Sequence, residues 1–210
     1  MRPQITPLEK RIDFDVDGDR EIMFFFCLPL LAKIKWRFPM KDLKKYIRDI
    51  PDFPKPGVIF KDITTLLKDK NAFKSVVDML VKRYKGKGIE KVVGVEARGF
   101  IFGAALAHAL KAGFVPVRKE KKLPHETLKE IYELEYGTDT VEIHKDAIQK
   151  GEKVLVLDDL LATGGTLGAT CRLVEKLGGD IFEVVTIIEL SFLSGREKLK
   201  NYRYYSMIVY

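Results

Sequence analysis

Cysteine is scarce in this chain of 210 residues, which contains only Cys27 and Cys171, far apart in the sequence. Two such residues make no disulfide framework, so we expect a protein of the reducing cytoplasm. Two glycine-rich nucleotide motifs are also missing, Gly-x-x-x-x-Gly-Lys-Ser/Thr and Gly-x-Gly-x-x-Gly. Their absence disfavours a P-loop nucleotide triphosphatase and a dinucleotide-dependent dehydrogenase.

Long hydrophobic runs are lacking as well. The mostly apolar stretch 22–34 is interrupted by Pro29 and is shorter than the ~20 residues that span a bilayer. Five acidic residues precede it, whereas an export signal starts with positive charge. The segment from Asp13 imitates a calcium-binding loop, but its twelfth position is Phe24 where a glutamate is needed. We therefore expect no membrane anchor, export signal or calcium site here.

The chain has a net charge of +7 and 46% hydrophobic residues, enough to fill one core. Its Lys and Arg residues are scattered rather than clustered, which favours a small polyanionic substrate over nucleic acid or a membrane surface. Residues 1–39 differ in pattern from the rest of the chain, and an amphipathic segment begins at Met40. We expect residues 1–39 to be an upstream extension without a role in the chemistry, and residues 40–210 to form the folded domain.

From Met40 onward, helical and strand patterns alternate, which predicts an α/β fold with a doubly wound parallel sheet. The predicted helices are 71–85, 100–111 and 167–177, and the predicted strands are 91–95, 114–117, 154–157 and 184–188. The charged excursion 119–150 interrupts this alternation, and its pattern predicts a hairpin of 128–136 with 141–144. Its length and charge favour a lid.

The most informative segment is 154–166, Val-Leu-Val-Leu-Asp-Asp-Leu-Leu-Ala-Thr-Gly-Gly-Thr. A buried strand delivers Asp158 and Asp159 to its carboxyl end, where open α/β sheets bind ligands. Adjacent carboxylates can accept hydrogen bonds from the vicinal hydroxyls of a ribose. A small-residue loop at a helix start then favours a phosphate; its residues are Ala162, Thr163, Gly164, Gly165 and Thr166.

This segment resembles the motif of type I phosphoribosyltransferases that binds phosphoribosyl pyrophosphate (PRPP). The resemblance extends from about residue 50 to the end of the chain, including 190–199. It implies the type I phosphoribosyltransferase fold, with a small hood at about 40–66 and 190–210 and a flexible β-hairpin lid at about 119–150. It further implies Mg²⁺ brought by PRPP rather than by protein ligands, and a homodimer.

A second anion site is indicated at Glu96-Ala97-Arg98, which follows the strand 91–95 and opens the next helix. Arg98 can clamp two phosphate oxygens, or it can pair with Glu96 or cap a neighbouring subunit. The resemblance makes this the pyrophosphate loop, with a cis peptide before Ala97. It also assigns pyrophosphate contacts to Arg118 and Lys122, within a charge run that on its own indicates a solvated surface. Lys121 departs from the family pattern, in which glycine is frequent.

Glu135 and Tyr136, in the tetrapeptide Leu-Glu-Tyr-Gly of 134–137, resemble residues of adenine phosphoribosyltransferases in particular. There the matching glutamate is the proposed general acid/base and the tyrosine belongs to the lid. A carboxylate near a purine can hold or shuttle the imidazole proton while nitrogen bonds to the anomeric carbon. The resemblance thus implies a catalytic set of Glu135, Arg98 and Lys122.

The segment 51–63, rich in proline and ending in apolar residues, is the predicted site of base selection. By resemblance, the main chain of Ile59 reads the adenine edge, Phe60 stacks on the ring, Lys61 lies nearby and Leu190 covers the opposite face. Core packing explains Phe60 and Leu190 equally well on single-residue grounds. Lys61 is arginine in many relatives.

We therefore expect a purine-salvage enzyme, a glycosyltransferase that converts adenine and PRPP into AMP and pyrophosphate. One alternative is a phosphoribosyltransferase for another base, such as hypoxanthine or xanthine. The other is a non-catalytic PRPP sensor that regulates transcription, which would carry a DNA-binding helical pair and a basic face. Residues 1–39 offer neither feature.

Overall fold

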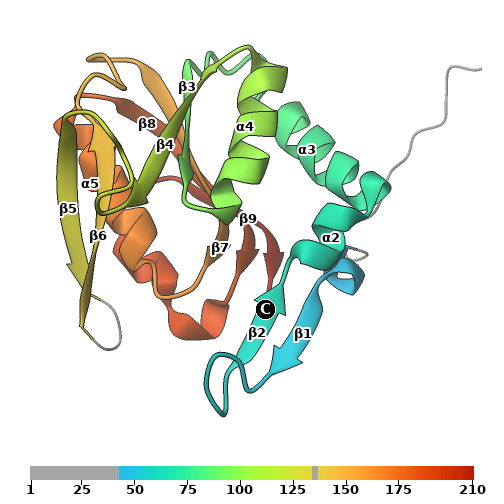
Figure 1. Ribbon diagram of the computed structural model, residues 1–210. Helices are drawn as coiled ribbons and strands as arrows, with labels where there is room; N and C mark the ends of the chain where they lie inside the picture. Colours follow the sequence, from blue (N-terminus) through green and yellow to red (C-terminus); the bar gives the residue numbers. More distant parts are fainter. Residues whose placement is uncertain (1–42, 134–136) are drawn as a thin grey trace, which may run out of the picture. The chain divides into compact units, whose positions relative to one another are not determined.

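The computed structural model describes residues 43–133 and 137–210. Its centre is a sheet of seven strands in the order β5-β6-β4-β3-β7-β8-β9 (Figure 1). The strands are β3 (Lys91–Val95), β4 (Gly113–Lys119), β5 (Thr127–Glu133), β6 (Thr138–His144), β7 (Lys153–Leu161), β8 (Asp180–Glu189) and β9 (Tyr204–Val209). The proposed boundary at residue 39 lies outside the described residues and stays a prediction.

Five neighbouring strands, β4, β3, β7, β8 and β9, run parallel to one another. This confirms the doubly wound parallel sheet at the centre of the fold, and it brings the carboxyl ends of these strands to one edge. The four strands predicted from the sequence are all present. The strand β9 was not predicted, although its run of aromatic and branched residues is typical of a strand.

Helices cover both faces of the sheet, as Figure 1 shows for α3 and α4 on one side and α5 on the other. The helices are α2 (Thr64–Lys68), α3 (Lys70–Tyr84), α4 (Arg98–Leu110) and α5 (Gly165–Lys176). Side chains along each central strand alternate between the two faces. Val92 packs with the cluster under α3 and α4, whereas Val93 packs with the cluster under α5. The three predicted helices are confirmed, and α3 begins where the Asp69 carboxylate accepts the main-chain N–H of Asn71 and Ala72.

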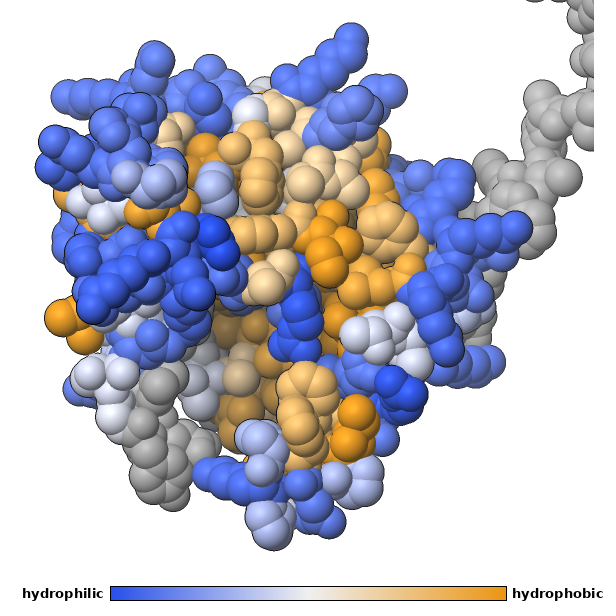
Figure 2. All heavy atoms as spheres, in the orientation of Figure 1, coloured by the Kyte–Doolittle hydropathy of each residue, from blue (hydrophilic) through white to orange (hydrophobic). Residues whose placement is uncertain are grey.

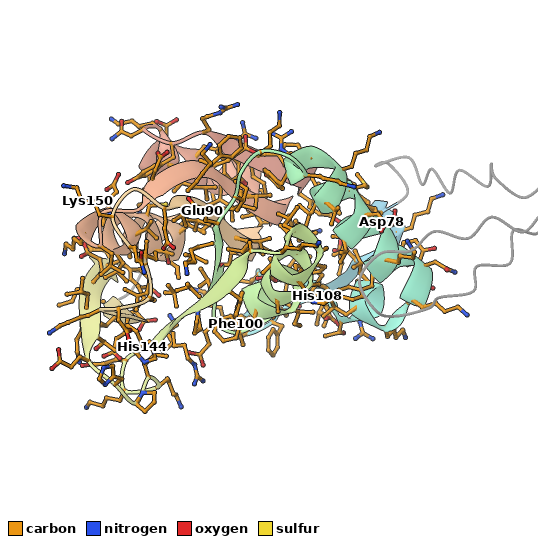
Figure 3. All side chains as sticks on the ribbon, turned by 90° about the horizontal axis from the view of Figure 1, so that it is seen from above. Asp78, Glu90, Phe100, His108, His144 and Lys150 are labelled. Atoms are coloured by element: carbon orange, nitrogen blue, oxygen red, sulfur yellow. The ribbon has the colours of Figure 1, made fainter. Side chains whose placement is uncertain are left out.

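The hairpin predicted within 119–150 is present, and it extends the sheet. Its strands β5 and β6 are antiparallel, and β6 pairs with β4 at Arg118↔Glu142 and Lys119↔Val141. Tyr132 and Val141 are buried in the core, so the base of the hairpin is part of the folded sheet. Figure 3 shows this side of the molecule, with His144 and Lys150, at the opposite end from Asp78 on α3.

The charges that suggested a solvated lid are largely paired on the hairpin. Lys129 lies 2.8 Å from the buried carboxylate of Glu142, and Glu130 accepts hydrogen bonds from Arg172 and Lys176 of α5. Pairs between two strands, or between a strand and a helix, join residues that are far apart in the chain, so the pattern of charge along the sequence does not predict them. The tip at 134–136, which carries Glu135 and Tyr136, lies outside the described residues.

A small two-stranded antiparallel sheet forms the hood (Figure 1). Its strands are β1 (Arg48–Pro51) and β2 (Ile59–Asp62), and the short 3₁₀ turns nearby are η1 (Lys44–Tyr46), η2 (Ser191–Leu193) and η3 (Gly195–Leu199). In the connecting turn the Phe53–Pro54 peptide is cis, and Gly57, at φ +83°, donates its main-chain N–H to Asp52. Arg48 anchors the hood base by binding the Asp62 carboxylate through Nε at 3.0 Å.

Within the described parts of the chain, no helix has the length and apolar character needed to cross a bilayer. Cys171 is buried in α5 with a free thiol, and burial raises the pKa of that thiol to about 12. A thiol with so high a pKa is inert at neutral pH, which agrees with a packing role. Cys27 lies outside the described residues.

Candidate active site

Two adjacent carboxylates, Asp158 and Asp159, lie in the carboxyl-terminal half of β7. Asp159 is almost fully buried, and its main-chain N–H donates to Oδ1 of Asp158 at 2.8 Å. Loss of water raises the pKa of both carboxyls, and the charge of its neighbour raises that of Asp158 further. A hydroxyl-bearing or cationic ligand would relieve this electrostatic cost.

Arg98, the first residue of α4, reaches across to this pair. Its Nε lies 2.9 Å from Oδ2 of Asp159, yet no donor among the described residues is aligned to hydrogen-bond that buried oxygen. The contact is an ion pair that leaves hydrogen-bonding capacity on both partners. Its guanidinium also lies 5.3 Å from the centre of the Phe60 ring of the hood. Arg98 therefore touches both the acidic pair and the hood.

The small-residue loop 162–166 follows β7 and runs into the first turn of α5, as the sequence predicts for a loop at a helix start. Gly164 has φ +77° at the N-cap of α5, a left-handed conformation that favours glycine. A hollow of about 80 Å³ lies at the loop, lined by Asp158, Leu160, Leu161, Ala162, Thr163, Gly164, Gly165, Thr166 and Leu167. An anion in this hollow would lie at a helix N-terminus, beside one of the two carboxylates that could hold a ribose.

Gly195, at the start of η3, supports this loop and was not singled out from the sequence. A Cβ on Gly195 would lie 2.2 Å from the Ala162 carbonyl oxygen, and a Cβ on Gly164 would lie 2.4 Å from the Gly195 carbonyl oxygen. Both distances are far inside van der Waals contact, so only glycine fits at either position. The one signal for Gly195 in the sequence is its place within the family-like segment 190–199.

The second predicted anion site is organised around Glu96. The Glu96–Ala97 peptide is cis, as the resemblance implies. Arg118 binds the Glu96 carboxylate through Nε at 3.2 Å and Nη2 at 3.0 Å, and the main-chain N–H of Lys119 adds a bond of 2.9 Å. Burial alone would raise the pKa of Glu96, but these hydrogen bonds outweigh it and lower the pKa. Glu96 thus pairs with Arg118, and Arg98 pairs with Asp159.

Lys122 stands at the end of this site, with its side chain exposed. Its main-chain oxygen accepts a bond of 3.1 Å from Nη1 of Arg118, which fixes the turn that presents it. Lys121 has φ +64°, the region that glycine adopts most readily. The departure from the family pattern at this position therefore carries a backbone cost.

The predicted base-binding residues lie on the hood and at the end of β8. Ile59 is 56% exposed, and Phe60 meets Phe53 edge-on with ring centres 5.2 Å apart. Lys61 points to Asp49, with Nζ 2.7 Å from Oδ1. Leu190 is half-buried against the core, and its main-chain N–H donates to the carbonyl of Leu161, just before the loop 162–166, the proposed phosphate loop.

The structure thus brings the acidic pair, the small-residue loop and Arg98 together at one edge of the sheet, with the Phe60 side of the hood facing Arg98. Glu135 and Tyr136 belong to 134–136 and lie outside the described residues. The described ranges 43–133 and 137–210 hold no group of three or more His, Cys, Asp or Glu side chains arranged to bind a metal.

Residues 62–209 match the model of the phosphoribosyl transferase domain family. The chain is 59% identical to the adenine phosphoribosyltransferase of Geobacter metallireducens over 171 residues, which are 81% of this chain and 100% of that protein. Against the protein of the same name from Geotalea daltonii the identity is 60%, over 80% of this chain and 99% of that protein.

Solved structures agree with these matches. The crystal structure of adenine phosphoribosyltransferase from Thermoanaerobacter pseudethanolicus has a TM-score of 0.79 and 53% identity, covering 82% of this chain and 100% of that one. The enzyme from Saccharomyces cerevisiae, crystallised with an imino-altritol bisphosphate and adenine, has a TM-score of 0.76 and 41% identity, over 80% and 97%. The chain therefore belongs to the phosphoribosyltransferase family, and within it to the adenine phosphoribosyltransferases.

Proposed function

We propose that this chain transfers the 5-phosphoribosyl group from PRPP to adenine and releases AMP and pyrophosphate, a reaction of purine salvage. The observation that carries this proposal is the acidic pair of half-buried Asp158 and buried Asp159 beside the small-residue loop 162–166 at the N-terminus of α5. A ribose 5-phosphate needs hydroxyl acceptors and an anion cradle about one sugar apart, and this edge of the sheet supplies both.

Displacement at the anomeric carbon builds positive charge on the sugar and negative charge on the leaving pyrophosphate. The carboxylates of Asp158 and Asp159 would hold the ribose hydroxyls and lie near the developing cation. Arg98, Arg118 and Lys122 would neutralise the leaving group, and the loop 162–166 would hold the 5′-phosphate. The hood residues Ile59 and Phe60, with Leu190 opposite, would bind the base, and Lys61 would lie nearby.

Glu135 is proposed as the general base for the purine, with Tyr136 in the lid, on the sequence motif alone. Mg²⁺ would arrive with PRPP and draw charge from the pyrophosphate oxygens. The chain fits such a substrate-borne ion because Oδ2 of Asp159, which is ion-paired with Arg98 but has no aligned donor among the described residues, can accept a hydrogen bond from water or a hydroxyl in its shell. Closure over the site would exclude water that otherwise hydrolyses PRPP.

We also propose a homodimer, to which the outer face of α4 would contribute. Ile101 is 40% exposed there, and Ala104 and Ala109 are exposed beside it. Figure 2 shows hydrophobic residues gathered over this part of the molecule. A helix that is apolar on nearly all sides is usually covered. Light scattering of the wild type and Ile101→Asp would test this, and a monomeric wild type would contradict it. The cytoplasmic location expected from the cysteine content stays a prediction.

A phosphoribosyltransferase for another base would share the PRPP site and differ at the hood and Leu190. The experiment is AMP formation from adenine, PRPP and Mg²⁺, run beside hypoxanthine, guanine, xanthine and orotate, with the full chain and a chain that starts at Met40. We expect strong preference for adenine in both chains. Preference for another base would overturn the specificity, and PRPP binding without turnover on any base would favour a sensor.

A further inference from the structure

The main chain of Tyr210 is hydrogen-bonded to both residues that flank Leu190. The Tyr210 N–H donates to the Glu189 carbonyl at 2.9 Å, and the Ser191 N–H donates to the main-chain oxygen of Tyr210 at 3.0 Å. The Ser191 hydroxyl adds a bond of 2.5 Å to the same oxygen. One residue thus holds both neighbours of Leu190, whose own N–H is bound by Leu161.

The aromatic ring of Tyr210 faces the hood. Nζ of Lys61 lies 4.1 Å from the ring centre, within the range of a cation–π interaction. The side chain of Lys61 is only 10% exposed, and Asp49 holds its Nζ at 2.7 Å. The hood lysine is therefore largely desolvated between a carboxylate and the tyrosine ring, where a cation–π contact is strongest.

Lys61 and Phe60 are neighbours on β2, so their side chains point to opposite faces of the small sheet. Phe60 turns toward Arg98, and Lys61 turns toward Tyr210. The ring of Tyr210 therefore supports the hood strand from behind, while its main chain fixes Leu190. Phe60 and Leu190 are the two residues proposed to enclose the base.

We infer that Tyr210 is a positioning residue for the nucleobase, which sets the relative placement of Phe60 and Leu190 through its ring and its main chain. This rests on the proposed function, because it presumes that these two side chains enclose adenine. Loss of the ring would release the hood strand and widen the base site. The PRPP site would stay intact, since the main-chain bonds of residue 210 do not depend on its side chain.

The experiment measures the KM for adenine, the KM for PRPP and kcat in wild type, Tyr210→Ala, Tyr210→Phe and Tyr210→Leu. We expect Tyr210→Ala to raise the KM for adenine about thirtyfold, the size of a desolvated cation–π contact, with the KM for PRPP within about twofold. Tyr210→Phe, which keeps the ring, should restore the adenine KM. Tyr210→Leu, which keeps much of the volume but has no aromatic face, should resemble Tyr210→Ala.

Lys61→Met tests the same contact from the hood. It should raise the adenine KM selectively, as Tyr210→Ala does. Lys44→Met is the matched control, because Nζ of Lys44 also lies over the Tyr210 ring, at 4.6 Å, but from η1 rather than from the strand that carries Phe60. It should leave the adenine KM within about twofold of wild type. Equal effects of the two lysine substitutions would contradict a specific role for the Lys61 contact.

An unchanged adenine KM in Tyr210→Ala overturns the inference, and so does an equal rise in both KM values, which would mean general disruption. A wild-type adenine KM in Tyr210→Leu would show that the aromatic face of residue 210 is not required. If Tyr210→Ala does not fold, the adenine KM of Lys61→Met tests the inference in its place. A selective rise supports the inference, and an unchanged value overturns it. A wild type that makes no AMP from adenine is a different result, because it removes the proposed function itself.

Discussion

Arg98 and Asp159 form an ion pair, Nε to Oδ2 at 2.9 Å, that joins the start of α4 to the carboxyl-terminal half of β7. The buried Oδ2 has no aligned hydrogen-bond donor among the described residues. The pair therefore holds the two walls of the proposed PRPP site together without using up the hydrogen bonds that a substrate needs.

Gly195→Ala should disrupt the phosphate loop, because the new Cβ would lie 2.2 Å from the Ala162 carbonyl oxygen. We expect a loss of about 1–3 kcal/mol in the free energy of unfolding, as in other overpacked sites, and a clear rise in the KM for PRPP. Gly168→Ala is the matched control. Its Cβ meets nothing closer than 3.6 Å, and alanine favours a helix, so stability should hold or rise. Equal effects would refute the packing argument.

Asp158→Asn should make the protein more stable at neutral pH and less active. Loss of water and the charge of Asp159 raise the pKa of Asp158 well above its ordinary value. A carboxyl whose folded-state pKa is raised contributes stability that is present below the unfolded-state pKa and is lost as the pH rises through the folded-state pKa. Asparagine avoids that loss, and its oxygen can still accept the Asp159 N–H.

The melting temperature of Asp158→Asn should therefore exceed that of wild type at neutral pH, and the difference should shrink toward about pH 4, near the ordinary pKa of aspartate. AMP formation should fall at least about tenfold, because a charged hydrogen-bond acceptor for the ribose is lost. A variant that is less stable than wild type at every pH would show that other interactions in the folded protein fully offset the cost of the Asp158 charge.

Glu96→Gln should destabilise the protein at neutral pH, an effect of opposite sign to that of Asp158→Asn. The folded-state pKa of Glu96 is depressed, so its stabilising contribution is present above the unfolded-state pKa and is lost as the pH falls through the folded-state value. We expect a cost of about 1–3 kcal/mol at neutral pH, vanishing in acid, together with weaker PRPP binding as Arg118 loses its anchor. Glu120→Gln, an exposed partner of Lys129, is the control and should show no measurable change in a thermal melt.

Lys121→Gly should stabilise the turn before Lys122. A residue with a Cβ at φ +64° carries a steric cost of about 1–2 kcal/mol, which glycine avoids in part at an entropic cost in the unfolded chain. A net gain of up to about 1 kcal/mol would raise the melting temperature by about 2–4 °C. Lys121→Ala removes the same charge but keeps the Cβ, so it should give no such gain. If alanine and glycine behave alike, backbone strain is not the cause.

Glu135→Gln should lower kcat far more than it weakens PRPP binding. General acid–base catalysis contributes about 10²–10⁴ in rate, so we expect a loss of at least about a hundredfold in kcat, with PRPP affinity within about threefold. Glu133→Gln is the control, because Glu133 is exposed at the end of β5, two residues earlier in the chain. Equal losses in kcat and PRPP affinity would contradict the role of Glu135 as the base.

Patterns among neighbouring residues are enough to predict the elements whose signals are local. The strand 91–95, the strand 154–157 and the helix 167–177 follow from short-range apolar periodicity, and the structure confirms them. The order of strand, acidic pair, small-residue loop and helix is likewise set by a few consecutive residues, and the structure confirms these elements, while their role in binding PRPP stays a prediction. The family relationship follows from several such segments in order.

Contacts between residues far apart in the chain depend on how the strands are ordered and packed. Arg98 pairs with Asp159 rather than Glu96 because the order of the strands places β7 next to β3, where α4 begins. The charged hairpin joins the sheet because its register with β4 buries Tyr132 and Val141.

Gly195 and Tyr210 acquire their contacts in the same way, from elements that pack against the phosphate loop and the hood. Contacts of this kind depend on strand order and on how the layers pack. Local periodicity carries no information about either, since the free energy that selects them comes from burying whole faces of the sheet.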